Sequence, residues 1–223
     1  MTRLSFALVG ALLFLGSSSV VRAQTSPAFT AEELEAIYTT TIDKRTRGIT
    51  ELLAISDETK SNTVHLIIMS QYRALRARDA AVDTMFQSLS PDIPGVESNR
   101  AAVVQLLSKP LHAEYLAKLA VQLSPAQIEI VKDRMTYGKV KVTYDAYCEI
   151  IPGLTDKEKA MILDTLKAAR EEAMDGGSAD EKSAIFQKYK NKINASLSTS
   201  GYDVVKATQE WEAKRAASTP PAN

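Results

Sequence analysis

The sequence predicts an all-α protein, a compact bundle of six or seven helices with one extended crossing segment near 136–144. Apolar residues recur at helical spacing over most of the chain, and helix-capping patterns precede four of these segments. Only the stretch 139–144 alternates with a period of two instead. The expected organisation is a signal peptide over 1–23, a single helical domain over 24–212 and a disordered tail over 213–223.

The first residues have the pattern of a secretory signal. Arg3 gives the positive start, the apolar stretch 4–15 is too short to span a bilayer, and Val21-Arg22-Ala23 fits the small-x-small cleavage pattern. We therefore expect a mature chain that begins near Gln24 and is exported to the periplasm or beyond. No cysteine lies at the cleavage point, so we expect no lipid anchor, and no membrane insertion after cleavage.

The charge balance excludes some classes of partner. The sequence has 27 basic and 27 acidic residues, and loss of the signal removes only Arg3 and Arg22. A net charge near zero gives no reason to expect nucleic acid or an anionic membrane surface as a partner. The oligomeric state is left open.

Capping patterns mark the starts of four helices. In each, a hydroxyl residue is followed three positions later by Glu or Gln, so that two side chains can satisfy backbone amides reciprocally. The pairs are Thr30 with Glu33, Ser124 with Gln127, Thr155 with Glu158, and Ser178 with Glu181. Further helices are expected over 61–87 and 98–122, the second kinked or split at Pro110 because proline lacks the amide proton.

The segment Met135 to Tyr147 interrupts this helical pattern. It contains three tyrosines, a glycine, and lysines that alternate with valines. The alternation predicts an extended connection with Val140 and Val142 on one face. We assign Met135 and the stretch from Val140 to Tyr147, apart from Lys141, to the core.

The other residues of this segment are the first candidates for ligand contacts. A tyrosine such as Tyr137 offers an apolar face and a hydroxyl, the combination that a sugar ring requires. Lys139 and Lys141 would point to one side of an extended segment and could meet the carboxylates of a uronic acid. Packing remains the alternative for all three residues.

Two further groups are candidates for a ligand or for catalysis. Arg73 and Arg76 lie beside Tyr72, and a guanidinium group matches a carboxylate bidentately, as an anionic sugar would require. Glu171 and Asp175 are four residues apart and share a helix face. Paired carboxylates across a cleft can cleave a glycosidic bond, although on an exposed helix they are more often solvated charge.

Other enzymatic patterns do not occur. His65 and His112, the only histidines, are far apart in sequence, lie in no zinc-ligand spacing, and are interpreted as structural residues. The sequence contains no nucleophile elbow and no phosphate-binding glycine loop. We expect no metal and no cofactor.

From Leu123 to Asp203 the sequence resembles a secreted bacterial family known as domain of unknown function 3826, and the first half resembles it more loosely. The matching residues are Leu123-Ser124-Pro125-Ala126-Gln127, Lys132 to Gly138, Val142-Thr143-Tyr144, Leu154-Thr155, Ala169 to Asp175, Phe186 to Lys190 and Gly201-Tyr202-Asp203. The resemblance implies a sugar-binding protein that accompanies enzymes degrading plant polysaccharides. It implies no catalytic residues.

The expected function is therefore non-catalytic binding of carbohydrate, such as fragments of plant polysaccharides, by an exported protein. A periplasmic chaperone or a structural helical protein is the first alternative. It rests on the segment 123–127, which is similar to the Leu-Thr-x-x-Gln element of small helical periplasmic chaperones; a helix cap explains the same residues. A glycan-active hydrolase or lyase that uses Tyr137, a lysine or Glu171 is the second alternative.

Overall fold

The computed structural model describes residues 29–218, so the expected signal peptide lies outside the described region. Within that region every regular element is helical and no strand occurs, which confirms the all-α class. Residues 29–218 form eight α-helices rather than six or seven, together with one short 3-10 helix. They are α1 Ala31–Thr50, η1 Glu51–Leu53, α2 Glu58–Phe86, α3 Val96–Gln122, α4 Pro125–Met135, α5 Lys139–Ile150, α6 Asp156–Met174, α7 Ala179–Thr199 and α8 Val204–Ser218.

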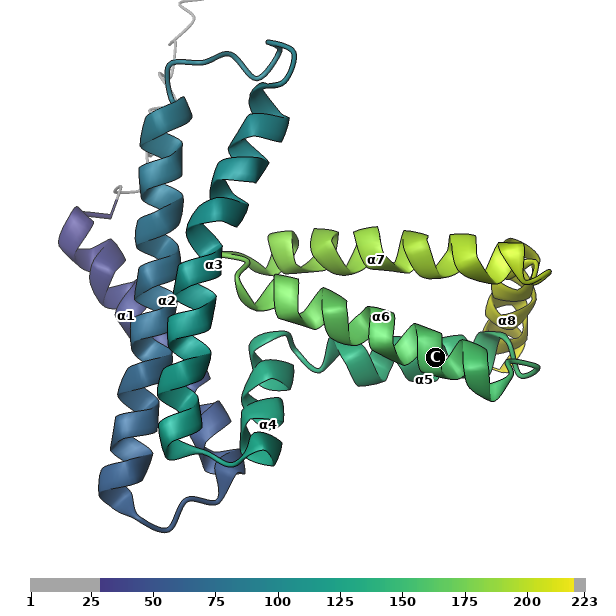
Figure 1. The fold of residues 1–223 in the computed structure, drawn as a ribbon, viewed down its shortest axis with the longest axis horizontal. Helices are drawn as coiled ribbons and strands as arrows, with labels where there is room; N and C mark the ends of the chain where they lie inside the picture. The colour runs from purple at the N-terminus through teal and green to yellow at the C-terminus, as the bar shows by residue number, and fades with distance from the viewer. Residues whose placement is uncertain (1–28, 219–223) are drawn as a thin grey trace, which may run out of the picture.

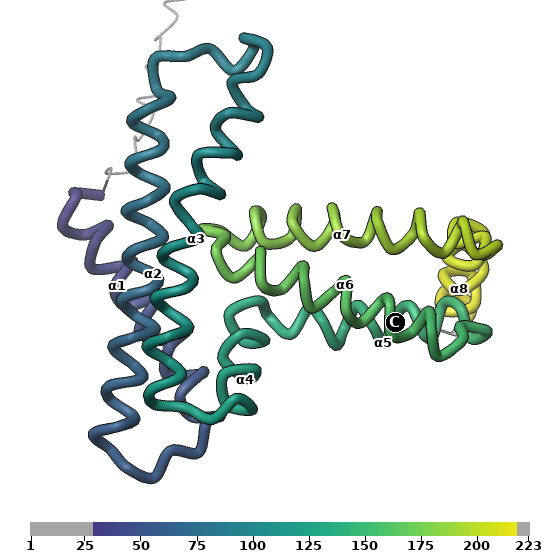
Figure 2. Tube along the Cα trace, in the orientation of Figure 1, coloured from purple at the N-terminus to yellow at the C-terminus, as the bar shows by residue number. Residues whose placement is uncertain are grey.

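The helices form two arms instead of one compact bundle. The first arm consists of α1 to α4, with α2 and α3 as a long antiparallel pair; the second consists of α5 to α8 and projects from the side of the first (Figure 1). The chain trace shows α8 across the far end of the second arm (Figure 2). Each arm has its own hydrophobic core.

The two cores meet where α4 and α6 lie against each other. In the first core, Ile68, Leu119 and Val131 come from three different helices, and Met174 reaches this core from the end of α6. In the second core, Ile162 and Ile193 join α6 to α7. The end of α6 therefore belongs to both arms, and this is where the polar contacts between the arms gather.

The predicted caps start the helices as expected. Reciprocal capping is present at Thr30, Ser124 and Thr155. At the fourth site the hydroxyl of Ser178 accepts the amide of Glu181, but the Glu181 carboxylate accepts the Gly177 N–H at 2.7 Å instead of closing the box.

Two helix boundaries differ from expectation. Helix α3 runs through Pro110 as one helix and is not split there. Helix α8 continues to Ser218, past the boundary at 213 where a disordered tail was expected. Helix α8 packs on α5 and α7 near the buried Val204, and the helix continues through residues 213–217 although these are exposed.

The prediction of an extended crossing segment near 136–144 was wrong. Instead, Tyr137 and Gly138 both adopt left-handed backbone angles, with φ of 59° and 64°, and α5 begins at the next residue. On a helix, side chains two residues apart are rotated by about 200° around the axis. Val140 is therefore buried while Val142 is 69% exposed. The β-branched alternation is overridden because α5 packs against α6 and α8.

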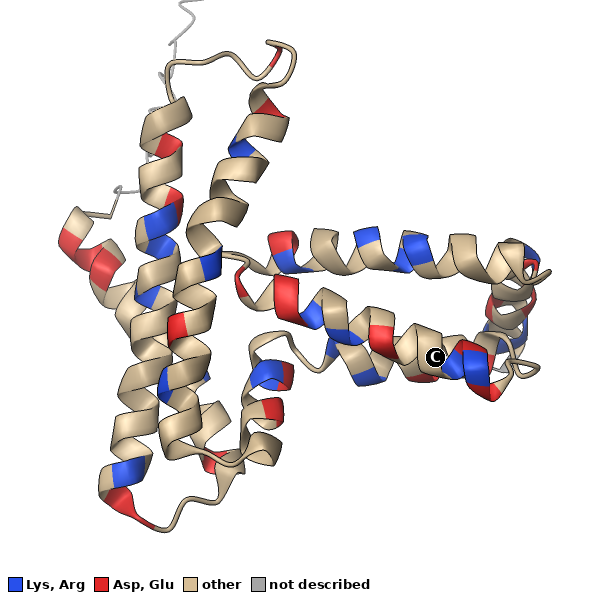
Figure 3. Cartoon of the chain, viewed as in Figure 1, with Lys and Arg blue, Asp and Glu red and all other residues tan. Residues whose placement is uncertain are grey.

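Charges of both signs are interspersed on the helices of both arms (Figure 3). No helix between residues 29 and 218 combines the length and apolar character needed to cross a bilayer.

Candidate functional site

The turn between the arms presents Tyr137 to solvent. Helix α4 ends at the buried Met135, and the hydroxyl of the buried Thr136 donates to the Lys132 carbonyl at 2.9 Å. The Gly138 N–H donates to the Asp133 carbonyl at 2.7 Å. These bonds hold Tyr137 in its left-handed conformation, which is unfavourable for any residue with a Cβ atom, while its side chain stays 47% exposed.

Tyr137 faces a hollow of about 280 Å³ on the first arm, here called the tyrosine hollow. Residues from α1, η1, α2, α4 and the turn contribute to it. Its lining consists of Arg45, Gly48, Ile49, Glu51, Leu52, Tyr72, Arg134 and Tyr137. The structure thus brings together Tyr72 and Tyr137, two of the candidate residues, from helices distant in sequence.

Tyr72 forms the inner wall of the hollow. Burial raises the pKa of its hydroxyl to about 12, and the nearby charge of Arg45 opposes this shift. The backbone carbonyl of Tyr72 accepts a hydrogen bond of 2.8 Å from the Tyr38 hydroxyl of α1. This bond fixes α1 against α2 at the level of the hollow.

Two arginines flank the tyrosines. Arg45 of α1 and Arg134 of α4 are exposed, and between residues 29 and 218 neither side chain makes an ion pair, a hydrogen bond or an aromatic contact. Glu51 of η1 is the acidic side chain at the rim. The hollow therefore combines two aromatic faces, two phenolic hydroxyls and an excess of positive charge.

The other candidates near Tyr72 lie beside the hollow. The Arg76 guanidinium is engaged, since it pairs with Glu35 at 2.8 Å and stacks over the Tyr38 ring at 4.1 Å. Arg73 is exposed on α2 and has no partner in the described residues. Neither is among the lining residues.

The two candidate lysines are not in the hollow. Because this segment is helical, Lys139 and Lys141 point in different directions. Lys139 reaches α7, where its Nζ donates to the Ser183 hydroxyl at 3.2 Å, and Lys141 pairs with Asp145 at 2.5 Å on the surface of α5. The expectation that both face one ligand was wrong.

Glu171 and Asp175 share a face of α6 and its end, as predicted, but they are not solvated charge. Both meet His112 of α3: His112 Nδ1 lies 3.1 Å from Asp175, and His112 Nε2 lies 3.6 Å from Glu171. Lys132 of α4 donates to both oxygens of Glu171 at 3.0 Å. This ionic cluster, here called the junction, joins the two arms.

The contacts at the junction favour the charged forms of Glu171 and His112. Burial alone would raise the pKa of Glu171, but hydrogen bonds from His112 and Lys132 lower it to about 2. Hydrogen bonds to Asp175 and Glu171 raise the pKa of His112 to about 9. Glu171 is therefore a carboxylate at neutral pH, which suits an ion pair and does not favour proton donation to a glycosidic oxygen.

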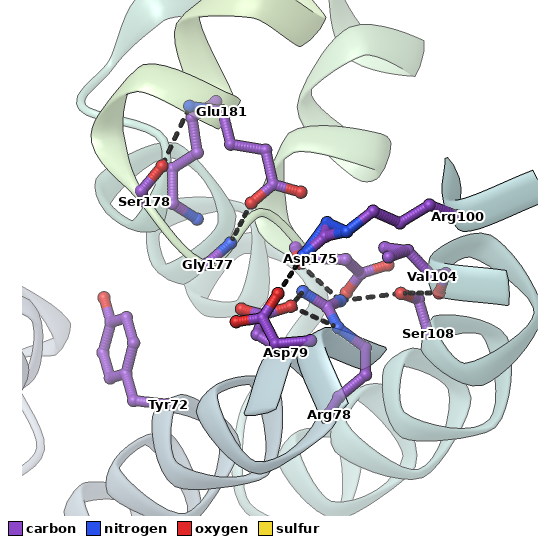
Figure 4. Close-up of polar contacts among 12 residues, drawn as sticks. Tyr72, Arg78, Asp79, Arg100, Val104, Ser108, Asp175, Gly177, Ser178 and Glu181 are labelled. Atoms are coloured by element: carbon purple, nitrogen blue, oxygen red, sulfur yellow. Dashed lines mark hydrogen bonds and ion pairs between the residues drawn. The ribbon is translucent and has the colours of Figure 1, made fainter. Parts of the chain in front are cut away.

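The buried Arg78 of α2 completes the junction (Figure 4). Its Nη1 donates to the Asp175 carbonyl and to the Ser108 hydroxyl, each at 2.7 Å, and its Nη2 donates to Asp79 at 2.6 Å. In the same view Tyr72 lies on α2 away from this cluster. The junction and the tyrosine hollow are thus separate sites.

A second, larger hollow of about 670 Å³ lies between α3 and the second arm. Its charged lining residues are mostly engaged within the protein, since Arg100 pairs with Asp83 and Lys188 pairs with Glu172 at 2.6 Å. No group of three or more His, Cys, Asp or Glu residues in 29–218 is arranged to hold a metal ion.

Sequence analysis missed Arg45 and Arg134 in the hollow, and it did not foresee that His112 joins the two arms. Arg134 precedes the Met135–Tyr147 segment and lies inside the family-like motif, so its position could have marked it. His112 was taken for a structural residue, which its place at the junction agrees with. Arg45 had no distinguishing signal, because it is an ordinary exposed position on α1 until the fold brings α4 beside it.

Comparison with known proteins returns one family. The family model described as "Protein of unknown function (DUF3826)" matches residues 39–217, which includes both arms and both sites. A search of curated proteins gives no match to the chain.

Proposed function

The chain belongs to the DUF3826 family of proteins of unknown function. From the geometry of the site, we propose that the protein binds carbohydrate in the tyrosine hollow. The observation that carries the proposal is the position of Tyr137. A tyrosine in a left-handed conformation costs about 1–2 kcal/mol, and about half of its side chain nevertheless stays exposed at the turn. Backbone strain of this kind points to a functional constraint.

The chemistry of the hollow fits a sugar ring. Tyr72 and Tyr137 provide aromatic faces for the C–H face of a ring, and their hydroxyls suit its polar edge. The volume of about 280 Å³ lies just below the range of about 300–1,000 Å³ that is typical of small-molecule sites. This size favours a short stretch of a glycan chain whose remainder extends into solvent.

The chaperone alternative draws less support. A client-binding chaperone needs apolar side chains gathered on one concave face. In the described region the exposed large apolar residues occur on several helices of both arms, for example Leu34 on α1, Leu106 on α3 and Val142 on α5.

Binding assays test the proposal directly. Isothermal titration or affinity gels against pectic and hemicellulosic oligosaccharides should show saturable binding, and Tyr137→Asn should weaken it at least tenfold, because asparagine keeps the left-handed turn but removes the ring. The matched control is Val142→Asn, an exposed position on α5 outside the hollow. Absence of binding across the panel would reject the function, and binding that is unchanged by Tyr137→Asn would reject the site.

We propose further that this binding takes place outside the cytoplasm, after removal of the signal expected in residues 1–23. N-terminal sequencing of the native protein from a periplasmic or secreted fraction should give Gln24 as the first residue. An intact Met1 in the cytoplasmic fraction would contradict export.

A further inference from the structure

The arginines of the described chain fall into two groups. Most have a partner: they pair with a carboxylate or stack on an aromatic ring, as do Arg47, Arg76, Arg78, Arg100, Arg170 and Arg215. Within residues 29–218, the ones without a partner are Arg45, Arg73 and Arg134. Two of these three line the tyrosine hollow and the third lies on α2 next to Tyr72.

This placement is informative because acidic residues are plentiful. The chain has as many acidic as basic residues, and α1 itself shows that pairing is available locally: Arg47, two positions from Arg45, pairs with Asp43 at 2.8 Å. Guanidinium groups left free in the lining of one concavity leave their donors available for an incoming anion.

We infer that the ligand of the tyrosine hollow is an acidic oligosaccharide, with a carboxylate or sulfate group held between Arg45 and Arg134. This inference rests on the proposed function and specifies its ligand. The planar fork of a guanidinium group donates two parallel hydrogen bonds to a carboxylate and also suits a sulfate. The two tyrosines then contact the sugar ring that carries the anionic group.

Glu51 opposes the binding of an anionic ligand in the hollow. Its carboxylate is at the rim of the same hollow and has no partner in the described part of the chain. It repels an anionic ligand, so the neutral variant Glu51→Gln should bind the same ligand more tightly. The affinity for an uncharged ligand should change little in Glu51→Gln.

The test compares an acidic ligand with its neutral ester and with a ligand whose charge comes from sulfate. A galacturonate oligomer of defined length, its fully methyl-esterified counterpart and a sulfated galactan oligomer without uronate are titrated into the full mature chain. We expect the acid to bind about tenfold or more tightly than the ester, the lower end of what a charge-assisted hydrogen bond contributes. The sulfated probe distinguishes carboxylate from sulfate as the source of charge.

Substitutions locate the effect. Arg45→Gln and Arg134→Gln should each weaken binding of the preferred acidic probe about threefold or more, and together abolish its advantage over the neutral ester. Arg47→Gln, on the same helix and outside the hollow, is the charge-matched control and should leave binding unchanged. All three positions are exposed, and circular dichroism verifies that the variants fold.

The outcomes separate the inference from the function on which it rests. Equal affinity for the galacturonate oligomer, its ester and the sulfated probe would overturn the acidic ligand while leaving carbohydrate binding in place. The acidic ligand is also overturned if Arg47→Gln weakens binding as much as Arg45→Gln, because a general charge effect would then explain the preference. Failure of all glycans in the panel would reject the function itself.

Discussion

His112 of α3 and Asp175 at the end of α6 join the two arms of the molecule through a contact of 3.1 Å between Nδ1 and Oδ1. This contact and the neighbouring Glu171 raise the pKa of His112 to about 9. A histidine whose pKa is raised on folding contributes stability that is fully present below its unfolded pKa, about 6.5, and is lost as the pH rises through the folded value. The junction therefore weakens under alkaline conditions.

We predict that the free energy of unfolding contributed by His112 falls between pH 6.5 and 9 by on the order of 2 kcal/mol. Urea denaturation of the native protein and of His112→Gln over this range measures the contribution as the difference between the two. The difference cancels the opposite effect of Lys182, whose pKa burial lowers to about 8. Parallel curves for the two proteins would contradict the prediction, and His65→Gln, which alters a contact with Asp43 in the first arm, should retain the fall.

Arg78→Met should destabilise the protein by about 3 kcal/mol. The substitution keeps the aliphatic length but removes the buried guanidinium that binds Asp79, Ser108 and the Asp175 carbonyl, and it leaves those groups without their partner. Chemical denaturation measures the loss. The control Arg47→Met removes a surface ion pair and should cost less than about 1 kcal/mol; equal effects would show that the buried position is not special.

Gly177→Ala should destabilise the turn between α6 and α7 by about 1–3 kcal/mol. A Cβ atom at this position would clash with the carboxylate of Asp79, which cannot turn away without loss of its pair with Arg78. Gly153→Ala is the control, because a Cβ there meets nothing within 4 Å. Thermal unfolding of the two variants gives the comparison, and a neutral Gly177→Ala would mean that Asp79 is easily displaced.

Tyr137→Asn should be the substitution that weakens ligand binding without loss of stability. Asparagine tolerates the left-handed conformation better than tyrosine, so the free energy of unfolding should stay the same or rise by up to about 1 kcal/mol. Gly138→Ala, one residue later at φ 64°, should instead cost about 1 kcal/mol. Clear destabilisation by Tyr137→Asn would show that the ring has a packing role.

The helix starts that depend on residues a few positions away could be predicted from the sequence. The hydroxyl caps at Thr30, Ser124 and Thr155 satisfy amides a few residues away, so their sequence pattern was sufficient. The start of α5 was not predictable in this way. Its alternating valines favour a strand on their own, and only contact with α6 and α8 decides in favour of a helix.

The site was predictable in part for the same reason. Tyr72 and Tyr137 were identified from residue chemistry, and the fold brings them together. Lys139 and Lys141 were grouped with them only because an extended segment was assumed. Arg45 carries no local signal, since its importance depends on the packing of α1 beside α4.

The hydrogen bond from Tyr38 to the Tyr72 carbonyl has a consequence for how such proteins diverge. Tyr38 and Arg45 lie on the same helix, so the bond helps to fix the register in which α1 presents Arg45 to the hollow. One residue inserted into α1 between them would rotate Arg45 by about 100° around the helix axis. The same rotation would move Gly48 and Ile49, which follow Arg45 on α1, so a shift in helix register changes the charge and the wall of the hollow together.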